Sequence, residues 1–347
     1  MGKTMHRNGQ QEPQKKPNLQ SVAAAAGVSL ATVSQVMRNT GRISDKTREK
    51  VLKAAKDLNY VPDGRAAAMR SGQNHEIGLV IHQIANPFNA EVISGVSDLL
   101  ETEGYLVSVL DSRDDPLKEA RNLEAFIRSG RGGLLWVPAV GARNRSFELL
   151  KTHQMPTVTF LRRAQQIACD HVGIENAAAT ATATRYLADL GHRHIAFFGG
   201  TGTGQVHLQR IAGYEAVMAE LALGTPLVWP CADNKLAGLE ANLALREAHP
   251  EVTALVCNGD MVAIGACLAL HRQGLTPGRD MSVVGFDDIA DAAVATPPLT
   301  TLAVSPHQLG RRLAQVLLDR IKTPDMPHVT VTVPAELILR GTTGKPA

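Results

Sequence analysis

Apolar residues near the beginning of the chain follow a short helical pattern that ends at a glycine. Leu19, Val22, Ala23 and Ala26 fall on one helical face. Gly27 then interrupts the pattern and supplies the conformational freedom that a tight turn requires. Because two of the inward-facing side chains are small alanines, a second helix can approach closely. The segment therefore predicts the first half of a two-helix unit.

A second helical pattern begins directly after this turn. Ser29 is a good N-cap, Val28 fills the corner between the helices, and Val33 and Val36 face inward. Together the two patterns predict a helix-turn-helix, whose second helix enters the major groove of DNA. An ordinary helical hairpin is the alternative interpretation.

The exposed residues of the second helix are candidates for contacts with DNA. Gln35 can pair with adenine in a bidentate way, and Leu30 and Ala31 can pack on a thymine methyl group. Arg38 and Asn39 are suited to phosphates, which set register without reading sequence. The contacts predicted in this region are Ser29, Leu30, Ala31, Thr32, Ser34, Gln35, Arg38 and Asn39.

A third amphipathic segment and a short basic stretch follow. Ser44 is the expected N-cap of the third helix, and its apolar stripe contains Val51, Ala54, Ala55 and Leu58. Residues 63–73 are rich in alanine and basic, and they would form only a marginal helix alone. This stretch is either a helix that forms when something holds it, or a plain linker.

Beyond the third helix, apolar runs alternate with segments of helical length. The runs lie at 77–81, 106–110, 133–137, 157–160, 194–198, 254–257 and 282–286. This alternation predicts parallel sheets with right-handed helical crossovers. Ligands of such folds bind at the carboxyl ends of the strands, so the polar residues just after each run are the candidates for a binding site.

Charge is distributed unevenly along the 347 residues, although the net charge is only +3. Residues 1–75 contain 13 Lys and Arg against 5 Asp and Glu, a net charge of +8. The remainder contains 23 against 28, a net charge of −5. The basic end favours a polyanionic partner, and a solvated basic tail is the alternative.

Cysteine spacing and the first residues indicate the compartment. The 4 cysteines are scattered without metal-ligand or disulfide spacing, which is typical of free thiols in a reducing compartment. The first 16 residues are polar and lack the apolar core of a signal peptide, and no apolar run is long enough to span a bilayer. We therefore expect a cytoplasmic protein with no membrane partner and a disordered tail at residues 1–16.

Several longer segments resemble one known family over about residues 17–341. The DNA-binding end reads VAAAAGVSLATVSQVMRNTGRISDKTREKVLKAAKDLNYVPDGRAAAMRSG. The remainder contains, in this order, IGLVIHQIANPFNAEVISGV, YLADLGHRHIAFFGG, RIAGYEAV, MVAIGACLAL and DMSVVGFDDIADAAVATPPLTTL. With these segments the chain resembles the lactose/galactose-repressor (LacI/GalR) family of transcriptional regulators.

The resemblance implies an α/β protein with an N-terminal all-α helix-turn-helix DNA-binding domain. Its core would be periplasmic-binding-protein-like, with two Rossmann-like lobes containing parallel sheets. The expected divisions are a headpiece at 17–62, a hinge helix or linker at 63–75, and an effector-binding and dimerisation domain at 76–341. Within the core, the first lobe would cover about 76–174 and 300–325, and the second about 175–299 and 326–341.

The resemblance also implies roles for particular residues. Within 63–70, which would fold on the operator, Met69 would be an apolar wedge between base steps, and Arg65 a further DNA contact. Arg210 and Asp287 would bind the effector, since Asp accepts hydrogen bonds from vicinal hydroxyls and Arg donates in a fork. The effector-binding residues expected in all are Phe88, Asn89, Arg162, Arg210, Asp233, Asp260 and Asp287.

Departures from the family pattern bear on the effector. Asn89 and Asp233 stand where relatives often have aromatic residues, which favours a hydroxyl-rich ligand, such as a sugar or a sugar derivative, over a stacked purine. Leu161 stands where sugar-binding relatives have Asp, and the neighbouring Arg162 leaves room for an acid or phosphate group. In the recognition helix, Gln35 replaces the usual Arg, so a different base preference is expected.

The resemblance implies a homodimeric repressor that binds a pseudo-palindromic operator in double-stranded DNA under the control of a small effector. The resemblance leaves open whether the effector releases or promotes DNA binding. The alternative is a ligand-binding protein or a sugar-processing enzyme with the same core and no role in gene regulation. No GxSxG motif is present, and the loop at 199–204 lacks the spacing of nucleotide-binding loops. We therefore expect no enzyme activity, no cofactor and no metal.

Overall fold

The computed structural model describes residues 16–62, 74–130 and 132–346. They belong to two compact units, one within residues 1–73 and one within 74–347, which are considered separately. The predicted tail, and the hinge segment with Arg65 and Met69, lie almost entirely outside the described residues.

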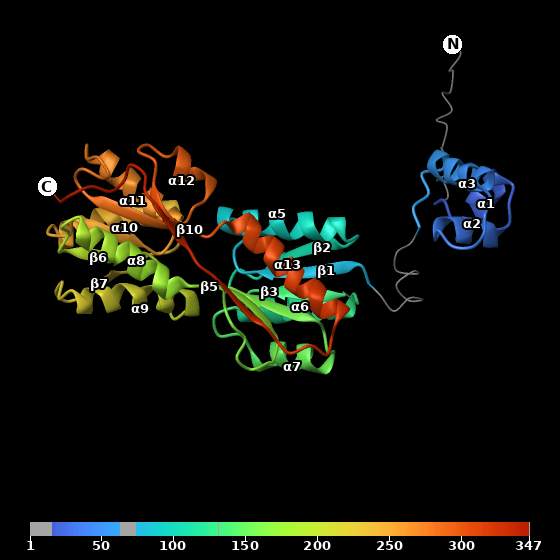
Figure 1. Cartoon of the computed structure of the whole chain (residues 1–347), viewed down its shortest axis with the longest axis horizontal. Helices are drawn as coiled ribbons and strands as arrows, with labels where there is room; N and C mark the ends of the chain where they lie inside the picture. The colour runs from blue at the N-terminus through green and yellow to red at the C-terminus, as the bar shows by residue number, and fades with distance from the viewer. Residues whose placement is uncertain (1–15, 63–73, 131, 347) are drawn as a thin grey trace, which may run out of the picture. The chain divides into compact units, whose positions relative to one another are not determined.

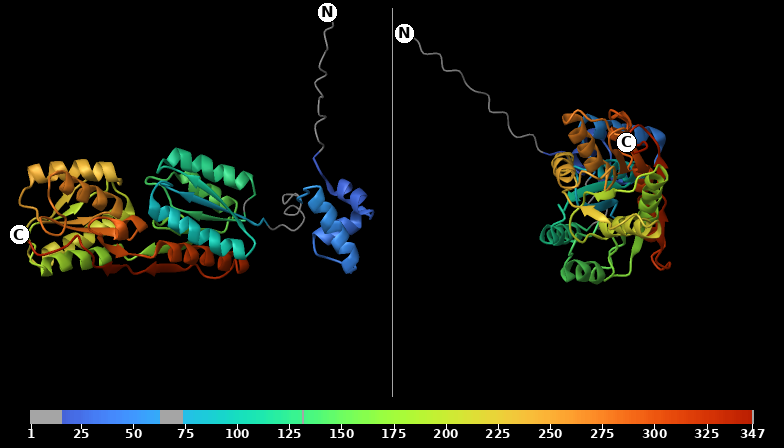
Figure 2. Two further views of the ribbon diagram at one scale, coloured as in Figure 1. Left: turned by 90° about the horizontal axis from the view of Figure 1, so that it is seen from above. Right: turned by 90° about the vertical axis from the view of Figure 1, so that its left-hand side faces the viewer.

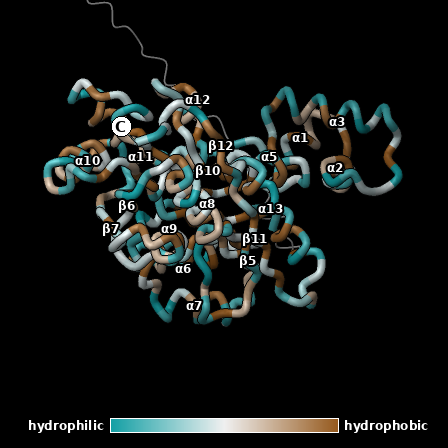
Figure 3. The backbone as a smooth tube through the Cα atoms, turned by 60° about the vertical axis from the view of Figure 1, so that its left-hand side comes forward, coloured by the Kyte–Doolittle hydropathy of each residue, from teal (hydrophilic) through white to brown (hydrophobic). Residues whose placement is uncertain are grey.

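The first unit contains three short helices around a small apolar core. They are α1 (Leu19–Ala26), α2 (Leu30–Met37) and α3 (Asp45–Asp57). Val22, Ala26, Val33 and Val51 are completely buried where the helices meet. The tube through α3 changes repeatedly between teal and brown in Figure 3, as an amphipathic helix requires. The three predicted helices are thus confirmed, except that Leu58 follows α3 and is 36% exposed.

Local capping explains where these helices begin and end. Asn18 and Ser21 form a reciprocal capping box at the start of α1. Gly27 ends α1 in the left-handed conformation, with φ 58°. Ser29 and Ser44 cap α2 and α3 by accepting hydrogen bonds from the backbone N–H groups of Thr32 and Thr47.

The second unit is built from two mainly parallel sheets, each covered by helices on both faces (Figure 2). The first has strand order β11-β5-β4-β3-β1-β2 and the second β12-β10-β9-β8-β6-β7. The strands of the first sheet are β1 (Glu76–Ile81), β2 (Leu106–Asp111), β3 (Gly133–Trp136), β4 (Thr157–Phe160), β5 (Asp170–Ile174) and β11 (Thr330–Val333). Those of the second are β6 (Ile195–Phe198), β7 (Leu227–Trp229), β8 (Ala254–Cys257), β9 (Ser282–Asp287), β10 (Thr300–Ala303) and β12 (Glu336–Ile338), of which β12 pairs antiparallel with β10.

Helices pack on these sheets through apolar stripes and on one another through close glycine contacts. They are α5 (Pro87–Thr102), α6 (Pro116–Arg128), α7 (Asn144–Thr152), α8 (Asn176–Asp189), α9 (Gln205–Glu220), α10 (Lys235–Ala248), α11 (Asp260–Arg272), α12 (Ala290–Val294) and α13 (Pro306–Lys322). Helices α5 and α13 lie side by side in Figure 1. A Cβ atom on Gly95 would lie 1.9 Å from the carbonyl oxygen of His307, so only glycine allows this approach.

The chain passes between the two lobes at three places, between β5 and α8, between β10 and α13, and between β11 and β12. This differs from the lobe boundaries expected from the sequence. Residues 300–303 belong to the second sheet and 330–333 to the first, because β10 pairs with β9 and β11 pairs with β5. Such long-range pairing is not specified by a local apolar run. Within the described residues, no single helix has the length and apolar composition of a membrane span. The bent pair α1–α2 has them only when the two helices are counted as one segment.

Candidate functional site

The geometry of α1 and α2 is that of a helix-turn-helix. The two helices are bent by 107° across the turn at Gly27, within the range of this motif. Val33 and Val36 fix α2 against the small core, so its opposite face is turned to solvent. Ser29, Leu30, Ala31, Arg38 and Asn39 are exposed. A face of this kind can lie in a major groove.

The remaining predicted contacts on α2 are half-buried. Thr32 lies in the cap of α2, and its hydroxyl is 2.8 Å from that of Ser29. The Gln35 amide lies against Gly41 in the following loop, where a Cβ atom would be 3.2 Å from Cδ of Gln35. Ser34 accepts a hydrogen bond at its carbonyl oxygen from Nε of Arg38, at 3.0 Å. Gly41 thus limits how the Gln35 side chain is placed.

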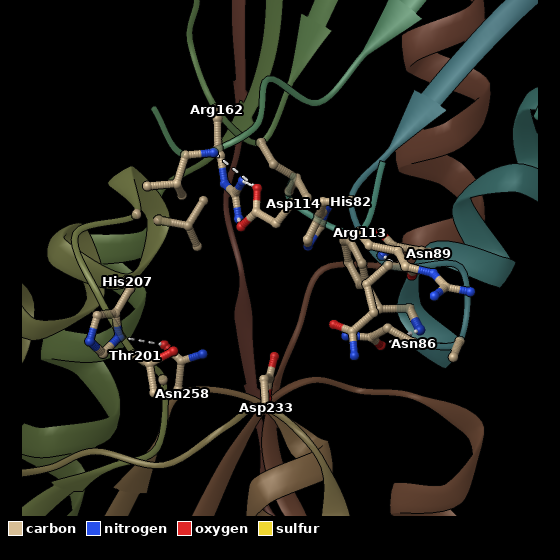
Figure 4. Close-up of a pocket in the computed structure, with 18 of the residues that line it drawn as sticks. His82, Asn86, Asn89, Arg113, Asp114, Arg162, Thr201, His207, Asp233 and Asn258 are labelled. Atoms are coloured by element: carbon tan, nitrogen blue, oxygen red, sulfur yellow. Dashed lines mark hydrogen bonds and ion pairs between the residues drawn. The ribbon is translucent and has the colours of Figure 1, made fainter. Parts of the chain in front are cut away.

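A cavity of about 650 Å³ lies within the second unit, between its two lobes. Its walls come from the carboxyl ends of strands in both sheets, as the fold class predicts. Of the seven effector-binding residues expected from the sequence, the structure brings six to this cavity: Phe88, Asn89, Arg162, Arg210, Asp233 and Asp287. Figure 4 shows the polar side chains converging from both lobes.

Arg210 and Asp287 form the buried polar centre of the second-lobe wall. Nη2 of Arg210 lies 3.6 Å from Oδ1 of Asp287, and Nε donates to Oδ1 of Asn176 at 3.0 Å. The guanidinium lies over the Phe286 ring, 3.5 Å from its centroid. Burial raises the pKa of Asp287 well above its usual range, although Arg210 opposes this shift. Hydrogen-bond donors from a ligand would favour the charged carboxylate here.

The backbone at Asp287 adopts an unusual conformation. Its φ is 115°, and that of the next residue, Asp288, is 56°. Side chains rarely tolerate such values, and strain of this kind is often kept at functional sites. Asp288 is held by Nη1 of Arg340 at 2.6 Å. It therefore has a structural partner, whereas Asp287 faces the cavity.

Asp260 does not line the cavity, so its expected role in effector contact is not supported. Its carboxylate is completely buried and accepts hydrogen bonds from the backbone N–H of Ile289 at 2.9 Å and from Oγ1 of Thr301 at 2.5 Å. Burial raises its pKa to about 7. Asp260 was predicted to contact the effector because it follows the apolar run at 254–257. It lies instead in the first turn of α11, with its carboxylate beneath the loop after β9. There it fixes the segment that follows Asp287.

Arg162, on the first-lobe wall, already has a partner. Its Nη1 and Nη2 donate to the two carboxylate oxygens of Asp114 at 2.5 and 3.1 Å, and Nη1 also donates to the carbonyl oxygen of Pro138 at 3.1 Å. Figure 4 shows this pair at the top of the cavity. Asp114 takes up both the charge and the paired donors of the Arg162 guanidinium, which argues against an acid or phosphate group of the ligand at this position.

Other cavity residues were not among the expected ones. Among them, His82 follows β1, Asp111 ends β2, and Arg113 and Asp114 follow β2. His207 and Asn258 also line the wall, with Nδ1 of His207 3.0 Å from Oδ1 of Asn258. The sequence did carry a signal for the residues at β1 and β2, because polar residues directly follow each of these two apolar runs.

A helix-turn-helix and a ligand-sized cavity in a two-lobed core, joined in one chain, define a DNA-binding regulator controlled by a small molecule. Comparison with known proteins agrees. Residues 18–63 match the model of bacterial regulatory proteins of the lacI family, and residues 184–343 match a periplasmic binding protein-like domain. The chain is 31% identical over 332 residues to the HTH-type transcriptional repressor PurR of Vibrio campbellii, covering 94% of this chain and 98% of that protein.

Two further relatives extend the comparison. The maltose regulon regulatory protein MalI of Escherichia coli is 29% identical over 335 residues, covering 93% of this chain and 98% of MalI. The solved structure of the Lac repressor dimer bound to operator and the anti-inducer ONPF superposes with a TM-score of 0.84 at 25% identity, covering 95% of this chain and 100% of that one. The chain belongs to the LacI family and is a sequence-specific DNA-binding transcriptional regulator with an effector-binding core. This confirms the fold class and function expected from the sequence.

Proposed function

We propose that this regulator is a homodimeric repressor that acts in the cytoplasm, and that a sugar or sugar derivative in the interlobe cavity controls its operator affinity. The observation that carries the proposal is the cavity itself. Its walls come from both lobes, so a ligand that touches both favours one relative position of the lobes. An effector acts on operator affinity only through such differential affinity for two states.

The relatives support this assignment. One similar solved structure is described as the transcriptional regulator CelR in complex with cellobiose, with a TM-score of 0.71 and 26% identity, covering 94% of this chain and 99% of that one. The Lac repressor structure is described as a dimer on its operator. We assign the same kinds of partner to this chain: a pseudo-palindromic duplex, a second copy of the chain, and a hydroxyl-rich small molecule.

Residues take the following roles in the proposal. Leu30, Ala31 and Gln35 read bases from α2, while Arg38 and Asn39 hold phosphates. Asp287 and Arg210 hold the effector, and Asp260 positions the loop behind Asp287. The segment at 63–75, with Arg65 and Met69, transmits the change between the units.

Operator affinity measured with and without a ligand tests the proposal. Operators are selected from a pool of random duplexes by the full chain, and sugars are screened by their effect on melting temperature. A sugar that binds should change operator affinity roughly 5–150-fold, the range of a coupling of about 1–3 kcal/mol. Linkage requires that the operator change sugar affinity by the same factor. Equal sugar affinity with and without operator would contradict the mechanism.

Asp287→Asn separates effector binding from DNA binding. Loss of a hydrogen-bonded charge of this kind costs about 1.5–3 kcal/mol, which corresponds to roughly 10–150-fold weaker sugar binding. Operator affinity without sugar should stay within about threefold of the parent, because Asp287 acts on the operator only through the sugar that it binds. Asp288→Asn is the matched control. A loss of both activities in Asp287→Asn would assign Asp287 a structural role.

An enzyme with the same core is the alternative, and the relatives named above are regulators. We propose that the ligand is not turned over. Prolonged incubation of the full chain with each stabilising sugar, followed by mass analysis of the sugar, tests this, and any product would contradict it.

A further inference from the structure

Three buried polar atoms of residues that line the interlobe cavity have no hydrogen-bond partner among the described residues. They are Nδ1 of His82, Oδ1 of Asn89 and Oδ1 of Asp233. Only three other buried side-chain atoms of the described residues share this condition. Buried polar atoms are normally satisfied, so their concentration in one cavity points to a ligand that satisfies them.

Two of the three atoms can only accept hydrogen bonds. The Asn89 amide is fixed, because Nδ2 donates to the carbonyl oxygen of Gln83 at 2.7 Å, so that Oδ1 is the acceptor without a partner. The ionised carboxylate of Asp233 has no donor of its own. Asn89 belongs to the first lobe and Asp233 to the second, and Figure 4 shows them on opposite sides of the cavity. The cavity therefore requires donors at both walls. His82 accepts or donates according to its tautomer and does not decide the question.

Two of the three arginines that line the cavity are already engaged by hydrogen bonds within the protein. Arg162 is bound by Asp114 through both of its terminal nitrogens. Arg210 donates to Asn176 and to the carbonyl oxygen of Asn258, and its third nitrogen faces Asp287. Arg113 also lines the cavity; its Nε lies 3.9 Å from Oδ2 of Asp111, and its side chain is 80% exposed, so that water screens its charge. A ligand anion would have to displace a carboxylate or a carbonyl oxygen from a buried guanidinium, and it would then leave that oxygen unpaired.

The second-lobe wall carries an excess of negative charge at one place. A Cβ atom on Gly259 would lie 3.3 Å from Oδ2 of Asp287 and 3.4 Å from Oδ1 of Asp233, so both carboxylates approach the same point. Arg210 is the guanidinium beside them. Burial raises the pKa of Asp233, as it does that of Asp287, and the two neighbouring carboxylates disfavour further negative charge at this wall. Donors or a positive charge from a ligand would relieve this, and a phosphate or carboxylate would increase it.

We propose that the cavity selects its effector by charge, accepting ligands that present several hydrogen-bond donors and carry no negative charge, and rejecting acids and phosphate esters. Asp233 and Asn89 are the specificity-determining residues. The ligands of this class are neutral sugars and amino sugars. The inference rests on the proposed function of the cavity and narrows the class of effector.

A panel of matched sugars tests the selection with the full chain. Each set contains a neutral sugar, its amino analogue, its acid and its phosphate ester, for example glucose, glucosamine, gluconate and glucose 6-phosphate. Corresponding sets are built on galactose, ribose and cellobiose, and affinities follow from melting-temperature shifts at several concentrations. Binding is expected from a neutral or amino member, with its anionic analogues at least tenfold weaker. An acid or ester that binds as tightly as its neutral parent overturns the proposal, and so does a panel in which no neutral or amino member binds.

Two variants test the residues that carry the selection. Asp233→Asn keeps the shape and removes the charge, so the preference for neutral over anionic members should shrink about tenfold. Asn89→Asp adds a negative charge to the opposite wall and should increase the same preference. Asp288→Asn is the matched control, because its carboxylate binds Arg340 and does not line the cavity. A preference that is the same in all three variants overturns the assignment.

Operator binding distinguishes this result from the proposed function. Operator affinity without any sugar shows that each variant is folded and tests the regulator itself. If the chain prefers neutral over anionic sugars but binds no duplex, the proposed repressor function is refuted and the proposed charge selection is supported. If operator affinity responds to an acid and to no neutral sugar, the repressor function is supported and the charge selection is refuted.

Discussion

The two units of this chain recognise partners of opposite character with differently built surfaces. The first unit carries its predicted contacts on the exposed side of one helix, α2, over a core whose buried members are eight small or medium side chains, such as Val33 and Val51. The core unit instead encloses its ligand residues between two lobes, with Asp287 and Arg210 almost completely buried. A small exposed unit can meet a long polyanion, whereas a buried cavity can distinguish small molecules by unmet hydrogen bonds.

This difference affects how each surface uses charge. Cations on the first unit face water and can neutralise phosphates with the release of counterions. In the cavity wall, Arg162 and Arg210 each lie beside a carboxylate of the protein itself, as Arg162 pairs with Asp114. The same residue type therefore supplies affinity at one surface and fixed geometry at the other.

Salt should separate the two surfaces most strongly. If the headpieces neutralise roughly 6–10 phosphates, operator affinity should fall about 10³–10⁵-fold between 50 and 200 mM salt. Binding of a neutral sugar should change less than about twofold, because no counterions are released. Titrations of both partners over this salt range measure the effect. Equal slopes for operator and sugar would remove the distinction.

A buried charge in the small core should remove one function and spare the other. Val33→Asp places a carboxylate in a completely buried position and should destabilise the first unit by more than about 4 kcal/mol. A unit of this size has little stability to lose, so it should unfold. Calorimetry should then show the core transition unchanged, with operator binding lost and sugar binding retained.

Leu52→Asp is the control for this change. Leu52 lies on α3 with 48% of its surface exposed, so the substitution should be tolerated. Loss of the core transition in Val33→Asp would show that the two units do not fold independently.

The sequence predicted the first unit almost completely and the cavity only in part. Capping and turn residues such as Ser29 and Gly27 act on neighbours within a few positions, so their pattern carries the structure. The strands β10 and β11 were assigned to the wrong lobes, because their pairing joins residues that are far apart in the chain. Position after a strand predicted the cavity residues Asp287 and Asn89, but it could not show which way a side chain points.

Asp260 and Arg162 illustrate that limit. Both follow apolar runs, yet one carboxylate is turned beneath a loop by Thr301 and Ile289, and the guanidinium is taken by Asp114 from another loop. Partners of this kind come from elements that local patterns do not connect. The sequence therefore predicted where the cavity lies better than what it selects.

Acid should destabilise the core unit through its buried histidines. Burial lowers the pKa of His171 to about 4, from 6.5 in the unfolded chain, with Arg163 contributing. The unfolded state therefore binds a proton that the folded state excludes, and stability is lost as the pH falls from about 6.5 to 4. One such residue should reduce the free energy of unfolding by about 3 kcal/mol at pH 4.

His171→Gln should make the loss of unfolding free energy between pH 7 and pH 4 smaller by about 3 kcal/mol, as measured by urea unfolding at both pH values. His153→Gln, at an exposed position, is the control and should leave the slope unchanged. The described part of the first unit, residues 16–62, contains no histidine, so its unfolding should not show this contribution. An unchanged slope in His171→Gln would contradict the assignment of the effect to burial.

Helix caps should give the smallest effect and the sharpest comparison of the two units. Asn18 caps α1 by accepting from the backbone N–H of Ser21 at 2.9 Å, and Asp115 caps α6 by accepting from that of Leu117 at 2.7 Å. Replacing either by alanine should cost about 1 kcal/mol. In the small unit this is a large share of the total stability, so Asn18→Ala should lower its melting temperature by roughly 4–8 °C, about twice the shift that Asp115→Ala causes in the larger core. Calorimetry of the full chain resolves both transitions, and equal shifts would show that the headpiece draws its stability from the core.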